Sequence, residues 1–135
     1  MFRNKQPLVC IIILNWNGLK DTLECIDSIK KIKYRNYKII VVDNASSNNE
    51  AKEIHEAYPN ELDVIKNEAN YGYTGGNNIG IEYAMSKYKP DYILILNNDI
   101  IVHPEFLDQL VIATLSDSTI NILSPLLYQL YSQIA

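Results

Sequence analysis

The groups best suited to chemistry follow an apolar stretch at residues 92–96, where Asn97, Asn98 and Asp99 come in succession. A buried strand holds the side chains at its end in fixed positions, and carboxylate and amide oxygens are the ligands that hard divalent cations prefer. At the C-terminal end of a strand in an open α/β sheet, such groups lie at the mouth of the ligand-binding crevice. We therefore expect Asp99, supported by Asn97, to bind Mg²⁺ or Mn²⁺ together with a phosphate-bearing ligand.

Polar residues also follow three other apolar stretches, at 8–14, 39–42 and 62–66. Because the C-terminal ends of parallel strands meet at one edge of a sheet, we expect these residues to join the same site. Asp43 can accept a hydrogen bond from a ribose hydroxyl or a nucleobase N–H, or it is an ordinary loop or helix-capping acid. The residues that we expect to contact the ligand are Asn15, Asn17, Asp43, Asn44, Asn70, Gly72, Tyr73, Gly75, Gly76, Asn77 and Asn98.

The stretch 67–78 is rich in glycine and asparagine and is predicted to be a loop that leads into a helix at about Asn78. Glycine lets a backbone approach a ligand closely, and a helix N-terminus favours phosphate through its free N–H groups. The spacing is neither GxGxxG nor a Walker A loop. The alternative interpretation is a flexible surface loop.

The rest of the chain alternates between strand and helix patterns, which predicts an α/β fold with a mainly parallel sheet and helices on both faces. Helices are expected at 19–32, from the 46–49 loop to about 58, at 78–88 and from Pro104 to about 115. A fifth strand is expected at 120–123. The chain of 135 residues contains no repeat or linker and is predicted to be one domain.

Composition excludes several classes of protein. The net charge is −4 and no concentrated basic segment appears, so we do not expect nucleic-acid binding. Cys10 and Cys25 form neither a disulfide framework nor a metal-spaced pair, which favours a reducing, cytoplasmic location. The chain lacks GxSxG and His-x-x-x-His, and His103, although close to Asp99, is interpreted as structural.

Taken together, five segments resemble the inverting glycosyltransferases of family two, which have the type A fold, and in particular their rhamnosyltransferase-like branch. The matching segments are IIILNWN (11–17), VVDNASS (41–47), NxxNxGYxGGNNxG (67–80), LILNND (94–99) and PxFL (104–107). The resemblance implies that Asn15, Asn17 and Asp43 hold the nucleoside of a nucleoside-diphosphate sugar. It implies that residues 72–77 lie along the nucleotide and sugar. Residues 97–99 would replace the DxD motif, with Asp99 on the metal, the metal on the diphosphate, and Asn97 where the first acid normally stands.

In this family the acceptor side and the general base come from a later segment. We therefore expect residues 1–135 to be a donor-binding domain without its C-terminal acceptor segment, with the base outside the chain. The acceptor would be a glycan or a lipid-linked acceptor, and the full-length enzyme would associate with the membrane. The apolar segment 126–131 is expected to be a truncated boundary or a homo-oligomer surface.

Two other interpretations stay open at this point. One is a non-catalytic nucleotide-binding module that pairs with another subunit. The other is a sugar-phosphate nucleotidyltransferase, against which the missing Gly-rich, basic first loop argues. A flavodoxin-like or response-regulator domain would not need the glycine-asparagine segment.

Overall fold

The computed structural model describes residues 5–127, in which four strands alternate with four helices. The sheet is entirely parallel, in the order β3-β2-β1-β4. In chain order the elements are β1 (Val9–Asn15), α1 (Leu19–Ile29), β2 (Tyr37–Asp43), α2 (Glu50–Ala57), β3 (Asp63–Lys66), α3 (Gly72–Lys87), β4 (Tyr92–Asn97) and α4 (Phe106–Ser116).

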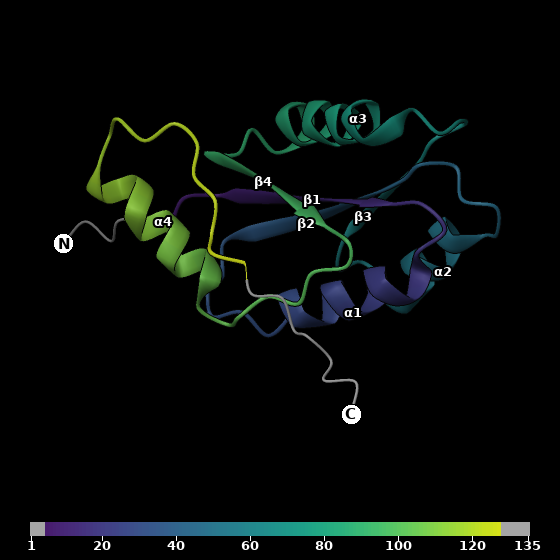
Figure 1. Ribbon diagram of the computed structural model, residues 1–135, viewed down its shortest axis with the longest axis horizontal. Coiled ribbons are helices and arrows are strands. Elements are labelled where there is room, and N and C mark those ends of the chain that lie inside the picture. Colours follow the sequence, from purple (N-terminus) through teal and green to yellow (C-terminus); the bar gives the residue numbers. More distant parts are fainter. Residues whose placement is uncertain (1–4, 128–135) are drawn as a thin grey trace.

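Helices cover both faces of the sheet (Figure 1). The odd-numbered residues of β1, such as Ile11 and Ile13, pack with α1, α2 and the inner side of α4. The even-numbered residues Cys10 and Ile12 pack with β2 residues against Ala84 and its neighbours on α3. Strands buried on both faces read as continuous apolar runs, which is why 8–14 and 39–42 were recognisable. The predicted α/β fold is confirmed.

Two predicted helix boundaries and one predicted strand were wrong. The helix expected from Asn78 begins at Gly72, so residues 72–77 are helical and not a loop; packing against the sheet overrides the low helix propensity of glycine. The helix expected to reach residue 32 ends at Ile29 and closes with turn bonds, such as that from Ile32 N to Ile29 O at 3.0 Å. The expected strand at 120–123 is irregular, and Ile122 is 93% exposed, because these residues pair with no strand of the sheet.

Close packing between α3 and the sheet depends on Gly80. A Cβ atom there would lie 2.6 Å from Ile12 Cγ2 and 3.0 Å from Val42 Cγ2, two branched side chains that are fully buried. We expect Gly80→Ala to lower the free energy of unfolding by about 1–3 kcal/mol through overpacking, despite the better helix propensity of alanine. Urea denaturation measures this. Ser86→Ala, at an exposed position of the same helix, should change stability by less than about 0.5 kcal/mol.

At the end of the described residues, Leu126 and Leu127 are exposed. The remainder of the apolar segment 126–131 lies outside the described residues. Across residues 5–127, no helix is both long enough and apolar enough to cross a membrane.

Candidate functional site

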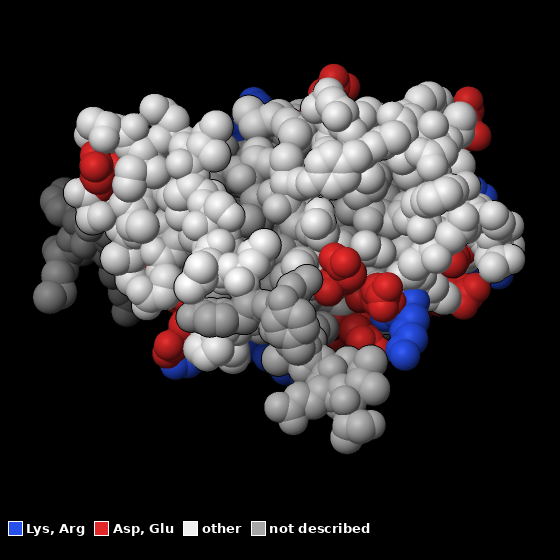
Figure 2. Space-filling view, in the orientation of Figure 1, with Lys and Arg blue, Asp and Glu red and all other residues white. Residues whose placement is uncertain are grey.

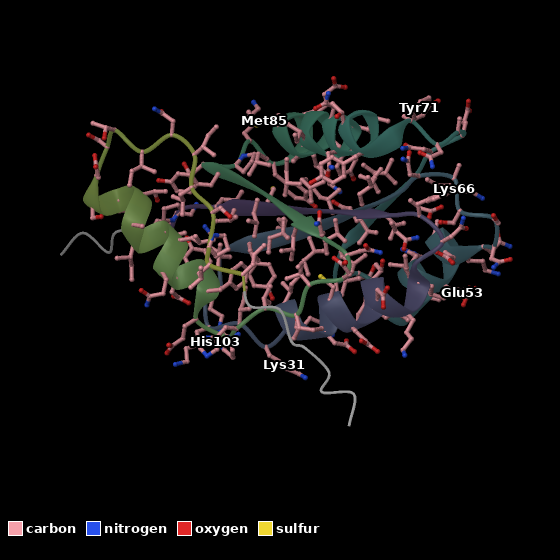
Figure 3. All side chains as sticks on the ribbon, in the orientation of Figure 1. Lys31, Glu53, Lys66, Tyr71, Met85 and His103 are labelled. Atoms are coloured by element: carbon pink, nitrogen blue, oxygen red, sulfur yellow. The ribbon has the colours of Figure 1, made fainter. Side chains whose placement is uncertain are left out.

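The C-terminal ends of the strands meet at one edge of the sheet, as predicted. In the register of the sheet Asn15 lies opposite Asp43, and Leu14 lies opposite Asn97. The N-terminus of α3 lies at the same edge, where Lys66 at the end of β3 and Tyr71 before α3 are labelled in Figure 3. The structure thus brings the predicted site segments together at one edge.

Asn15 and Asp43 lie inside this edge and bind each other. Both are fully buried, and the Asn15 Nδ2 atom donates to Asp43 Oδ1 at 2.8 Å. Ser46 Oγ donates to the same Asp43 oxygen at 2.5 Å, while the Ser46 N–H lies 3.3 Å from Asp43 Oδ2. A buried carboxylate is stable only when its oxygens are paired. These contacts therefore stabilise the loops that follow β1 and β2.

Glu50 is a residue of this network that the sequence analysis missed. It is only 6% exposed, although it is the first residue of α2. Its Oε2 atom accepts hydrogen bonds from Asn15 Nδ2 at 2.9 Å and from the Gly18 N–H at 3.1 Å. An acid in the first turn of a helix is ordinary sequence chemistry, so only the fold reveals that this one points into the sheet edge.

Asn17 shapes the loop after β1 through its backbone and side chain. Its φ angle is 50°, its N–H donates to Ser46 Oγ at 2.9 Å, and its Oδ1 accepts from the Ser47 N–H at 2.7 Å. The neighbouring Trp16 is left exposed. This loop therefore presents an aromatic surface on a fixed backbone.

Asn44 ties the start of α3 to the end of β2. Its Oδ1 accepts from Asn67 Nδ2 at 3.0 Å and from the Tyr71 N–H at 3.1 Å, and its Nδ2 donates to Asn70 Oδ1 at 2.8 Å. Asn70 Oδ1 also accepts from the N–H of Gly72, whose φ of 72° favours glycine. The asparagines of the predicted loop thus hold the N-terminus of α3 in place.

The first turns of α3 contain the other predicted contacts. Tyr73 is exposed at the edge, and Gly75 packs on Tyr71. Gly76 packs on the side chains of Leu14 and Asn44, with no room for a Cβ.

Asn77 is 3% exposed, and its Nδ2 donates to the Tyr73 carbonyl at 2.9 Å. Its Oδ1 is buried without a hydrogen-bond partner among the described residues. A buried acceptor of this kind is costly unless a ligand or water completes it.

The end of β4 and the residues after it expose two of the three predicted polar side chains. Asn97 and Asp99 are exposed, and the Asn97 Oδ1 lies 3.4 Å from the hydroxyl of Tyr73. Asn98 is half-buried and its Nδ2 donates to Thr22 Oγ1 at 3.1 Å. Figure 2 shows acidic side chains gathered where the end of β4 lies over α1. One carboxylate and neighbouring amide oxygens suit a hard cation that completes its shell with water and phosphate.

Two nearby groups do not add to this donor set. Burial, with a smaller contribution from the charge of Asp99, raises the pKa of the Cys25 thiol to about 12, so the thiol stays protonated. Its Sγ donates to the Asn97 carbonyl at 3.7 Å. His103 Nδ1 accepts from the Glu105 N–H at 3.2 Å, a local contact before α4 that fits its structural interpretation. Within residues 5–127 no group of three or more histidine, cysteine or acidic side chains is placed to hold a metal ion together.

Comparison with known proteins decides the family. Glycosyl transferase family 2 matches the chain over residues 10–129. The chain belongs to this family. The resemblance drawn from the five sequence segments is thereby confirmed.

Among its relatives, the rhamnosyltransferase WbbL of Escherichia coli strain K12 is 39% identical over 98 residues, which cover 70% of this chain and 36% of WbbL. The low-salt glycan biosynthesis hexosyltransferase Agl10 of Haloferax volcanii is 31% identical over 117 residues, which cover 85% of this chain and 35% of Agl10. The chain therefore spans about a third of the length of these relatives.

Solved structures confirm the type A fold. S. aureus TarS 1-349 in complex with UDP-GlcNAc matches with a TM-score of 0.70 at 22% identity, over 81% of this chain and 31% of that protein. The mannosyltransferase PcManGT of Pyrobaculum calidifontis, in complex with GDP-Man and Mn²⁺, matches with a TM-score of 0.66 at 20% identity, over 77% of this chain and 31% of that protein.

Proposed function

We propose that this chain binds the nucleoside diphosphate of a sugar nucleotide and supplies the donor-binding half of an enzyme that transfers the sugar to an acceptor hydroxyl. The observation that carries the proposal is that Asn97, two residues before Asp99, lies opposite Leu14 of β1 and contacts Tyr73 at the start of α3 on one sheet edge. Membership of glycosyl transferase family 2 supports it.

In this proposal Asp99, with Asn97 as a weaker ligand, holds Mg²⁺ or Mn²⁺ against the diphosphate. The exposed positions of these two side chains support the assignment. A divalent cation bound there would stabilise the charge that develops on the departing nucleoside diphosphate. The N–H groups of the first turn of α3 other than that of Gly72, which donates to Asn70 Oδ1, would add hydrogen-bond donors for phosphate.

The nucleoside would lie between the loop after β1 and the start of α3. Trp16 and Tyr71 are exposed on these two segments, while Asn15, Asp43 and Asn44 hold the segments in place. Among the described residues Asp43 Oδ2 accepts only the 3.3 Å hydrogen bond from the Ser46 N–H, so it is the oxygen that a nucleoside hydroxyl or N–H would reach if the Ser46 loop moved. The unpartnered Asn77 Oδ1 would accept a further bond.

The remainder of the reaction lies with groups that we do not assign to this chain. An acceptor hydroxyl would attack the sugar from the face opposite the diphosphate, with a carboxylate as the general base. We propose a glycan or lipid-linked acceptor and membrane association for the full-length enzyme.

Calorimetric titration with UDP, GDP and dTDP, each with Mn²⁺ and with EDTA, tests the proposal. We expect one or more of these nucleotides to bind, and to bind more tightly with Mn²⁺, because the cation bridges Asp99 and the diphosphate. Absence of binding by all three would contradict the proposed function. Equal affinity with Mn²⁺ and with EDTA would contradict the assignment of Asp99 but leave nucleotide binding in place.

A further inference from the structure

A chain of hydrogen bonds joins the segment after β4 to the buried carboxylates behind the loop after β1. Asn98 Nδ2 lies 3.1 Å from Thr22 Oγ1, and Thr22 Oγ1 lies 2.7 Å from Asn15 Oδ1. On its other side Asn15 contacts Asp43 at 2.8 Å and Glu50 at 2.9 Å. Thr22 and Asn15 are fully buried. The two parts of the proposed site are therefore linked through one hydroxyl on α1. We call this series of hydrogen bonds, from Asn98 through Thr22 to Asn15, the relay.

The direction of every bond in this relay is fixed by chemistry. The Gly18 N–H can only donate, so the Glu50 Oε2 that lies 3.1 Å from it is an acceptor. Asn15 must therefore turn its NH₂ group toward Glu50, which leaves its Oδ1 toward Thr22.

That oxygen takes the single proton of the Thr22 hydroxyl. Thr22 can then only accept from Asn98, whose NH₂ group must point inward. The amide orientations thus follow from a backbone N–H and need no independent assignment.

The orientation of the Asn98 amide determines which of its atoms can contact a ligand. With one N–H of its amide bound to Thr22, Asn98 keeps its Oδ1 free of hydrogen bonds among the described residues, and that oxygen is not one of the buried unpaired atoms. Space for this arrangement depends on Gly18, because a Cβ there would lie 2.7 Å from Asn98 Nδ2. Asn98 therefore offers the ligand its Oδ1 as an acceptor, together with the one N–H of its amide that Thr22 leaves free.

We propose that Thr22 is a positioning residue that fixes the amide of Asn98 so that its oxygen, beside the carboxylate of Asp99, serves the divalent cation. This rests on the proposed function, in which the segment after β4 holds that cation. Thr22 itself touches no ligand and acts through Asn98.

The direction of the relay is tested without any ligand, by thermal unfolding in EDTA. Asn98→Asp places a carboxylate oxygen against a hydroxyl whose proton is already used, whereas Asn97→Asp adds the same charge at an exposed position. We expect Asn98→Asp to lower Tm by about 5 °C or more and Asn97→Asp to change it much less. Equal Tm values for the two variants would overturn the relay.

The positioning role is tested by titrating the nucleotide that the wild type binds, with Mn²⁺ and with EDTA. Thr22→Val removes the hydroxyl that orients Asn98, so we expect metal-dependent affinity to fall about tenfold while the affinity in EDTA changes by less than about threefold. Thr22→Ser keeps the hydroxyl and should restore the wild-type values. Thr114→Val, which removes a hydroxyl that bonds only within α4, is the matched control.

Wild-type affinity of folded Thr22→Val with Mn²⁺ would overturn the role of Thr22. So would failure of Thr22→Ser to rescue the loss. If the wild type itself shows no metal-dependent binding, the proposed function fails and the cation role of Asn98 fails with it. The relay is then still decided by the unfolding of Asn98→Asp and Asn97→Asp, so the two failures are distinguishable.

Discussion

Replacing Asp99 with alanine should remove metal-dependent nucleotide binding, with affinity in Mn²⁺ falling by about 100-fold, or about 2.7 kcal/mol. Asp99 supplies the only carboxylate of the segment 97–99, and the amides beside it carry no charge to hold a cation. Among the described residues no group of three histidine, cysteine or acidic side chains is placed to hold a metal ion in its stead. Affinity in EDTA should stay close to that of the wild type, since the cation makes no contribution there.

Calorimetry of Asp99→Ala beside Glu53→Ala makes this comparison specific. Glu53 is exposed on α2, so its removal changes the net charge equally without touching the proposed metal site. Equal losses of affinity in the two variants would show that Mn²⁺-dependent binding follows the net charge of the protein and not Asp99 in particular. Unchanged Mn²⁺-dependent affinity of Asp99→Ala would reject Asp99 as the ligand. Asn97→Asp, which supplies an acid at the first position of the motif, should strengthen Mn²⁺-dependent binding.

The gathering of the site segments at one sheet edge was predictable because the ends of the strands can be recognised in the sequence. Apolar runs such as 92–96 mark strands buried between helices, and polar residues such as Asp99 follow them directly. A parallel sheet then brings these ends to one edge, so sequence order alone predicts that Asp43 and Asp99 share it. The orientations of the side chains are set by tertiary contacts and were not predictable.

Asp43 and Glu50 illustrate that limit. Asp43 was expected to face a ligand, and in the fold both of its oxygens contact neighbours within the edge. Glu50 reads as an ordinary first-turn acid, yet it is buried against Asn15. The start of α3 was misplaced for a related reason, because Asn44 and Asn70 support a glycine-rich turn that has poor helix propensity by itself.

Replacing Asn15 with leucine should lower the free energy of unfolding by about 3–5 kcal/mol, a large share of the stability of a domain of this size. Leucine is similar in size but offers no donor to Asp43 and Glu50 and no acceptor to Thr22. Two buried carboxylates would lose an amide that both share, and leaving a buried charge without its partner is strongly destabilising. Urea denaturation followed by far-UV circular dichroism measures the loss.

Ser46→Ala is the matched control, because it also removes a bond to Asp43 but leaves the Asn15 amide between the carboxylates. Its expected cost is about 0.5–1.5 kcal/mol. If Asn15 served chiefly as a ligand contact, Asn15→Leu would cost no more than Ser46→Ala and would weaken only nucleotide binding. A loss of stability well above the control would instead establish that Asn15 first holds the loops of the site together, and that any contact with the nucleoside depends on that network.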